Sequence, residues 1–135
     1  MFLLTDTALV TSASDLTLAS DCEFAFLRVL DVRLGWASQD DIPPDDAMLE
    51  RAAELGGVHE NRLLERYRAE HGDALVSFSD DRPKGADALR ARAAETRDAL
   101  AAGAPVVYQG VFFDESDPEL PFVGYADFLV RQSDG

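Results

Sequence analysis

The stretch that decides the fold is VVYQGVFFDESDPELPFVGYADFLV, residues 106–130. Its two ends, 106–113 and 122–130, are rich in β-branched and aromatic residues, which favour strands. Between them, residues 114–119 supply the aspartates, serine and proline that are typical of turns. The pattern predicts an antiparallel hairpin over 106–130.

Helices are expected before this hairpin. Residues 14–30 carry apolar side chains at helical spacing, and Ser12 or Ser14 is available as the N-cap. A second helix is expected over 47–70, because two prolines precede it and a glycine follows it. The other expected elements are a cap at Asp45 or Asp46, a stop at Gly72, a short strand at 74–78 and a helix at 88–102.

Composition sets limits on the class of protein. A chain of 135 residues with 47% hydrophobic residues is expected to form a single domain, 1–135, with a real core. No apolar run approaches the ~20 residues that span a bilayer, so no membrane partner is expected. The single cysteine, Cys22, excludes an internal disulfide and fits a cytoplasmic location. The net charge of −14 argues against simple nucleic-acid binding, since phosphate contacts need basic residues.

The second helix carries a histidine within its apolar pattern. Its stripe runs at steps of three or four through Met48, Ala52, Leu55, His59, Leu63 and Tyr67. His59 is therefore expected on the inward face, one turn after Gly56. Such an imidazole is either a satisfied core histidine or a metal ligand.

The final strand carries a carboxylate, Asp127, among apolar residues. Burying an unpaired carboxylate is costly, so Asp127 needs a cation, hydrogen-bond donors or an exposed face. The residues alone leave three environments open for Asp127: a solvent-exposed face of the strand, an ion pair with an arginine, or a metal site shared with His59. Histidine with carboxylates favours Mg or Mn, which serve phosphodiester hydrolysis.

Five segments resemble, in this order, the RecB-type branch of the PD-(D/E)XK nuclease superfamily: SASDL at 12–16, CEFAFL at 22–27, GGVH at 56–59, VYQGVFF at 107–113 and GYAD at 124–127. The resemblance implies an α/β (α+β) restriction-endonuclease-like core, with helices on a small, mainly antiparallel sheet. It also implies Mg- or Mn-dependent hydrolysis of DNA in repair or recombination, with His59 and Asp127 as metal ligands. Gln109 is a further candidate for the rim of the site. Large relatives join such a nuclease to a helicase portion in the same polypeptide.

The chain also departs from that family. The family carries Asp or Glu, any residue, then Lys on the strand after the aspartate, and nothing after Asp127 matches this motif. Lys84, the only lysine, lies before Asp127 in an expected loop. We therefore expect a portion of a nuclease, truncated before the catalytic strand and inactive alone. Some relatives hold an iron–sulfur cluster from the position of Cys22, but a cluster needs four thiolates, so Cys22 is expected to be a small core residue.

Two alternative readings and one expectation about self-association remain. A non-catalytic acidic interaction module is the alternative from another class, and the net charge favours it. A degenerate nuclease fold kept for scaffolding is a third reading. If the strand after Asp127 is missing, the sheet edge that it leaves exposed favours self-association.

Overall fold

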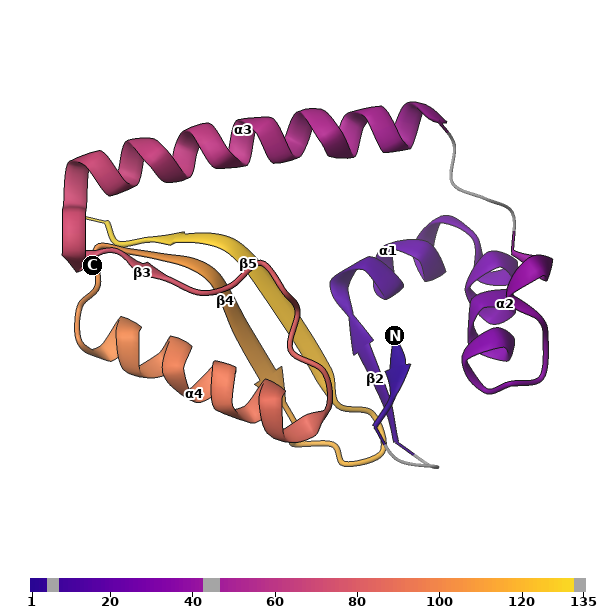
Figure 1. Ribbon diagram of the computed structural model, residues 1–135. Coiled ribbons are helices and arrows are strands. Elements are labelled where there is room, and N and C mark those ends of the chain that lie inside the picture. The colour runs from indigo at the N-terminus through magenta and orange to yellow at the C-terminus, as the bar shows by residue number, and fades with distance from the viewer. Residues whose placement is uncertain (5–7, 43–46, 133–135) are drawn as a thin grey trace. The chain divides into compact units, whose positions relative to one another are not determined.

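The computed structural model describes residues 1–4, 8–42 and 47–132 and shows a mixed α+β protein (Figure 1). Its strands are β1 (Phe2–Leu3), β2 (Leu9–Ser12), β3 (Val76–Ser77), β4 (Val106–Asp114) and β5 (Phe122–Val130). Its helices are α1 (Ala13–Asp21), α2 (Glu23–Arg33), α3 (Ala47–His71) and α4 (Ala86–Ala101), with single 3-10 turns at Gln39–Asp41 and Gly72–Ala74. The expected cap of α3 at Asp45 or Asp46 lies outside the described residues.

The strands follow the order β1-β2-β5-β4-β3 in one mixed sheet. β1 and β2 are antiparallel, whereas β2 with β5 and β3 with β4 are parallel. Parallel strands need a crossover connection, and helices supply it between these pairs. The sheet is therefore mixed, where the sequence predicted a mainly antiparallel one. The hairpin of β4 and β5 is present, with the Arg131 N–H donating to the Pro105 carbonyl at 2.9 Å.

By its internal contacts the chain divides into two compact units. Unit 1 comprises residues 1–44 and 113–124, and unit 2 comprises residues 45–112 and 125–135. Strand β5 begins in unit 1 and ends in unit 2.

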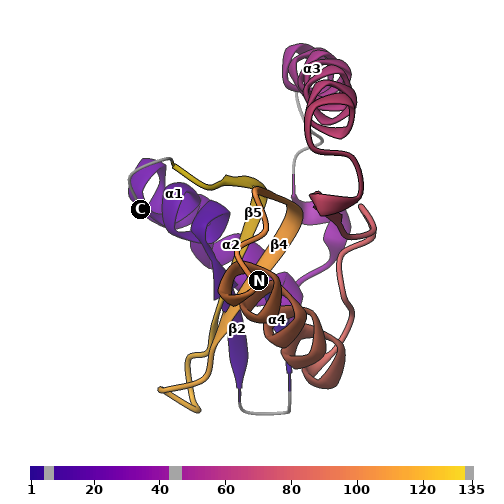
Figure 2. The same ribbon diagram turned by 90° about the vertical axis from the view of Figure 1, so that its left-hand side faces the viewer.

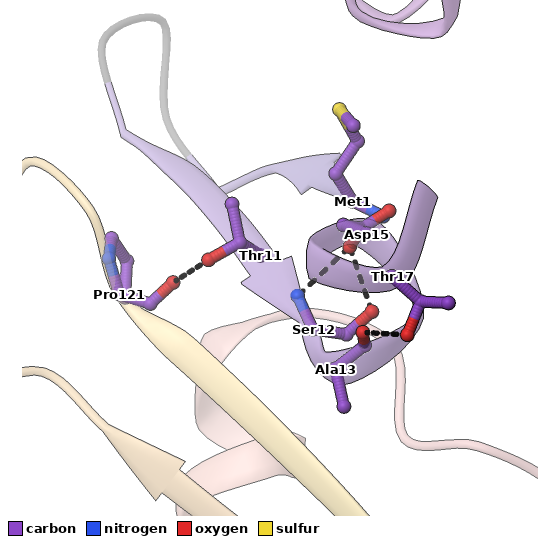
Figure 3. A network of polar contacts seen from close by, with 7 residues as sticks. All are labelled: Met1, Thr11, Ser12, Ala13, Asp15, Thr17 and Pro121. Carbon is purple, nitrogen blue, oxygen red and sulfur yellow. Dashed lines mark hydrogen bonds and ion pairs between the residues drawn. The ribbon is translucent and has the colours of Figure 1, made fainter. Parts of the chain in front are cut away.

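Unit 1 pairs the beginning of the chain with the beginning of β5. Thr11 and Ser12 of β2 are in register with Phe122 and Val123. The Thr11 N–H donates to the Pro121 carbonyl at 3.0 Å, and the Thr11 hydroxyl lies 3.5 Å from the same oxygen (Figure 3). Neither β1 nor β2 was predicted from the sequence.

Helix α1 begins with a capping box built on Asp15. The Ser12 N–H and hydroxyl donate to Asp15 Oδ2 at 2.8 and 2.7 Å, and the Met1 ammonium lies 2.8 Å from the same oxygen (Figure 3). Burial raises the pKa of Asp15, but the ammonium and the Ser12 hydrogen bonds outweigh burial and hold the pKa below its usual value. The predicted cap at Ser12 is confirmed.

The helix expected over 14–30 is broken at Cys22. This residue has extended backbone angles, φ −156° and ψ 100°, so it ends α1 and caps α2. Ser20 and Asp21 precede the break, and their side chains compete for backbone hydrogen bonds in a helix interior. Cys22 is exposed, so the prediction of a small core residue is wrong.

In unit 2, α3 and α4 lie on opposite sides of β4 and β5 (Figures 1 and 2). On the α4 side, the buried Thr96 hydroxyl donates to the Arg92 carbonyl at 2.8 Å and accepts from the Val111 N–H at 3.0 Å. A Cβ added to Gly110 would lie 2.9 Å from the Leu129 side chain and 3.2 Å from that of Thr96. Glycine at 110 therefore lets α4 and β5 approach β4 closely.

The predicted helix 47–70 is confirmed as α3, which ends at His71. Gly72 follows with φ 53°, a left-handed conformation that glycine adopts without strain. Across the residues described, no helix has both the length and the apolar character needed to cross a membrane.

Candidate functional site

Three aromatic side chains hold the C-terminal half of α3 against the strands of unit 2. The Tyr67 ring lies 5.6 Å from the Phe128 ring, which lies 5.1 Å from the Tyr108 ring, measured between centroids. Aromatic pairs at such distances attract beyond their buried area. The face of α3 that carries Tyr67 is therefore its inward face. At helical spacing before Tyr67, this face includes Leu64, Glu60 and Gly57.

The Gln109 side chain on β4 meets two carboxylates, Glu60 of α3 and Asp127 of β5. Gln109 Nε2 donates to Glu60 Oε1 at 2.7 Å and lies 3.4 Å from Asp127 Oδ1. The first is a short hydrogen bond, and the second is at the long limit for one. A single amide nitrogen thus joins carboxylates from α3 and β5. We name Glu60, Gln109 and Asp127 the amide–carboxylate cluster.

Gln109 has an unusual backbone within β4. Its φ is 56°, and it is the only non-glycine residue with positive φ among those described. This conformation costs about 1–3 kcal/mol and persists where surrounding contacts determine it. Two kinds of contact hold Gln109 in this conformation. Its side chain contacts Glu60 and Asp127, and both of its neighbours in the strand, Tyr108 and Gly110, are buried. The turn of the backbone also interrupts the alternation of side chains, as at a β-bulge.

Tyr108 extends the network. Burial, and then hydrogen bonds to Asp80 and Glu60, raise the pKa of Tyr108 well above its usual value. The two carboxylates therefore keep the phenol protonated as a donor. Asp80, in the loop after β3, adds a third carboxylate next to the cluster.

The sequence predicts that α3 contributes His59 to this site, whereas in the structure α3 contributes Glu60. His59, expected on the inward stripe, is exposed, so that expectation is wrong. Among the described residues no hydrogen bond joins it to Gln109 or Asp127, while Glu60, about 100° further around the helix, makes the contact. Its spacing of seven residues from Tyr67 was the available signal for Glu60. The role of His59 and Asp127 as metal ligands stays a prediction.

The remaining candidates lie as follows. Gln109, predicted at the rim, is at the centre of the cluster, and the exposed Asp127 lies beside it. Cys22 belongs to unit 1 and has no part in the cluster. Nothing in the sequence pattern pointed to Asp80, which depends on how its loop folds against Tyr108.

The donor types in the cluster suit a hard cation. Two carboxylates and an amide carbonyl are the oxygen ligands that Mg²⁺ and Mn²⁺ prefer. Among the side chains that the structure describes, no three or more of His, Cys, Asp or Glu are arranged to hold a metal ion. The oxygen atoms of the cluster are thus of the type that Mg²⁺ and Mn²⁺ bind, and they come from two carboxylates that converge on one amide group.

Comparison of the chain with protein-family models, with curated proteins and with solved structures finds no match. The resemblance to RecB-type nucleases thus depends on the five ordered segments of the sequence. Two residues of the cluster, Gln109 and Asp127, lie within those segments, and Glu60 lies outside them.

Proposed function

We propose that this chain contributes a metal site to a Mg²⁺- or Mn²⁺-dependent DNA nuclease of the RecB type. The observation that carries the proposal is the convergence of Glu60 and Asp127 on the Gln109 amide, at 2.7 and 3.4 Å. The ordered segments supply the second support, because the GYAD segment ends in Asp127. A restriction-endonuclease-like core belongs to the same proposal.

Each residue of the cluster has a proposed role in binding a divalent cation. Asp127 and Glu60 would hold a divalent cation through their carboxylate oxygens, and Gln109 would turn its amide oxygen toward it. A cation bound there supplies Lewis-acid charge and an activated water for attack on a phosphodiester. His59 is a further proposed ligand on the strength of the resemblance alone. DNA, and a helicase portion in the same polypeptide, are the proposed partners.

Isothermal titration calorimetry with MnCl₂ tests the metal site. The unmodified chain is expected to bind Mn²⁺ weakly, and Glu60→Gln and Asp127→Asn are expected to abolish the binding. Asp98→Asn is the matched control, because Asp98 is an exposed carboxylate on α4, on the other side of the strands. If Glu60→Gln and Asp98→Asn bind alike, the cluster is not the site. His59→Ala, measured separately, decides whether the imidazole is a ligand.

A digestion assay tests the expectation about activity. No Asp/Glu-x-Lys motif follows Asp127 in this sequence, so the chain alone is expected to leave single-stranded DNA intact in Mn²⁺. Digestion that requires Mn²⁺ and is lost in Asp127→Ala would contradict that expectation while supporting the nuclease assignment.

A non-catalytic acidic interaction module is the second candidate, and the net charge of −14 favours it. In that case the carboxylates serve solubility and partner recognition, and the cluster only fixes α3 on the sheet. Calorimetry separates the two candidates, because the interaction module predicts no heat of Mn²⁺ binding that depends on Glu60 or Asp127.

A further inference from the structure

Helix α3 carries a second stripe on the side opposite its inward face. Arg51, Leu55, Val58 and Arg62 follow one another at steps of four, three and four residues, so they share one side of the helix. Leu55 is 71% exposed and Val58 is 49% exposed. We name these four residues the arginine–leucine stripe.

Packing within unit 2 does not account for the stripe. Leu64 on the inward face is only 4% exposed, and the aromatic contact of Tyr67 lies on that same face. Leu55 and Val58 instead line a shallow surface depression together with Arg51 and Glu54. A contiguous exposed apolar patch rimmed by charged residues is one mark of a surface that binds a partner.

The charges of the stripe have one sign. Arg51 and Arg62 are exposed, and no carboxylate within the described parts of the chain forms a salt bridge with them, whereas the Arg66 guanidinium lies over the Tyr67 ring, 5.3 Å from its centroid. Other arginines do form such pairs: Arg28 with Asp31, Arg90 with Asp87 and Arg92 with Glu95. In a chain of net charge −14, the two arginines of the stripe are a local pair of positive charges, with the exposed carboxylates of Glu54 and Glu65 at its flank.

We propose that the arginine–leucine stripe binds an acidic amphipathic helix of a partner protein. Arg51 and Arg62 lie about 16 Å apart along the axis, at 1.5 Å per residue. A partner helix with carboxylates eleven residues apart meets both, and two apolar side chains between them cover Leu55 and Val58. The apolar contact supplies affinity, and the arginines set register and orientation.

The same observations disfavour three other occupants. In a second copy packed stripe to stripe, Arg51 faces Arg51 when the helices are parallel and Arg62 when they are antiparallel, and like charges repel. Nucleic acid offers phosphates but nothing apolar for Leu55 and Val58. An anionic bilayer is an extended polyanion, and its surface repels a chain of net charge −14. The stripe also lacks the aromatic residues of membrane-surface helices.

Fluorescence anisotropy with a labelled synthetic peptide tests the proposal. The probe is an alanine-rich helix with two glutamates eleven residues apart and two leucines between them. Saturable binding to the full chain is expected, and Arg62→Glu weakens it about tenfold. Arg97→Glu, an exposed arginine on α4, makes the same change in net charge and leaves the binding unchanged. A peptide with lysines in place of the glutamates restores binding to the Arg51→Glu, Arg62→Glu double variant.

Several results overturn the proposal. The first is the absence of saturable peptide binding, and the second is equal weakening of that binding by Arg97→Glu and Arg62→Glu. The third is that the lysine peptide fails to bind the double variant although the circular dichroism of that variant matches that of the unmodified chain. Light scattering that shows a dimer dissociated by Arg62→Glu assigns the stripe to a second copy. Binding of DNA or of phosphatidylglycerol vesicles that depends on Leu55 and Val58 assigns it to a polyanion.

Discussion

Replacing Asp15 by asparagine tests the network at the start of α1. Asparagine keeps the shape of the side chain but removes the charge that accepts from the Met1 ammonium and twice from Ser12, at 2.7–2.9 Å. Loss of a helix cap costs about 1 kcal/mol, and loss of a hydrogen bond to a charged group costs about 1.5–3 kcal/mol. Because the amide oxygen keeps one donor, we expect the free energy of local unfolding in unit 1 to fall by ~2 kcal/mol.

This effect depends on pH in a defined direction. The pKa of Asp15 is lower in the folded chain than in the unfolded one. Its contribution to stability is therefore complete above the unfolded value of about 3.9 and is lost as the pH falls through the folded-state pKa. The unmodified chain and Asp15→Asn are expected to converge in stability at acid pH.

Hydrogen exchange is the suitable assay, because it resolves the two units. A loss of ~2 kcal/mol corresponds to about 30-fold faster exchange of the amides in β2 and α1 at neutral pH. Asp21→Asn, at the exposed end of α1, is the control and is expected to leave exchange unchanged. Acceleration below about threefold in Asp15→Asn, or equal acceleration in both variants, would refute the reasoning.

Two further predictions concern unit 2. The pKa of Tyr108 is higher in the folded chain than in the unfolded one, so the phenol's contribution to the free energy of unfolding is complete below about pH 10 and declines above it. Urea unfolding at alkaline pH should therefore show a decline in stability that is smaller in Tyr108→Phe. Thr96→Val should lower the free energy of unfolding by about 1–3 kcal/mol, because the Val111 N–H loses its acceptor in a fully buried place. Thr96→Ser keeps the hydroxyl and should lose only about 1 kcal/mol, the contribution of one methyl group. Equal losses in urea unfolding of Thr96→Val and Thr96→Ser would show that the hydrogen bond is not the cause.

Elements with strong local signals were predictable from the sequence. The strand at 122–130 has the predicted bounds, and α3 differs from its prediction by one residue. In both cases local chemistry decides the outcome: β-branched and aromatic residues favour the strand, and Gly72 ends the helix because it accepts φ 53°. The capping box of Ser12 and Asp15 is local as well.

The side of α3 that packs was not predictable in the same way. The helix has apolar residues on two sides, and Leu63 and Leu64 are adjacent, so periodicity does not say which side meets the sheet. The aromatic contact of Tyr67 with Phe128 decides it, and that contact joins residues far apart in the sequence. For this reason the apolar pattern predicts His59, and not Glu60, on the inward face. The break at Cys22 also lacked a strong signal, since neither proline nor glycine marks it.

The pairing of β2 with β5 has a consequence for how the protein is made. Thr11 and its partner Pro121 are 110 residues apart in the sequence. A ribosome adds about 5–20 residues per second, so roughly 5–20 s pass between the synthesis of the two partners. During that interval Val10, fully buried in the finished protein, is open to solvent or to a chaperone. The capping box of α1 needs no such delay, so the first helix is able to form on the nascent chain before the strand beside it has a partner.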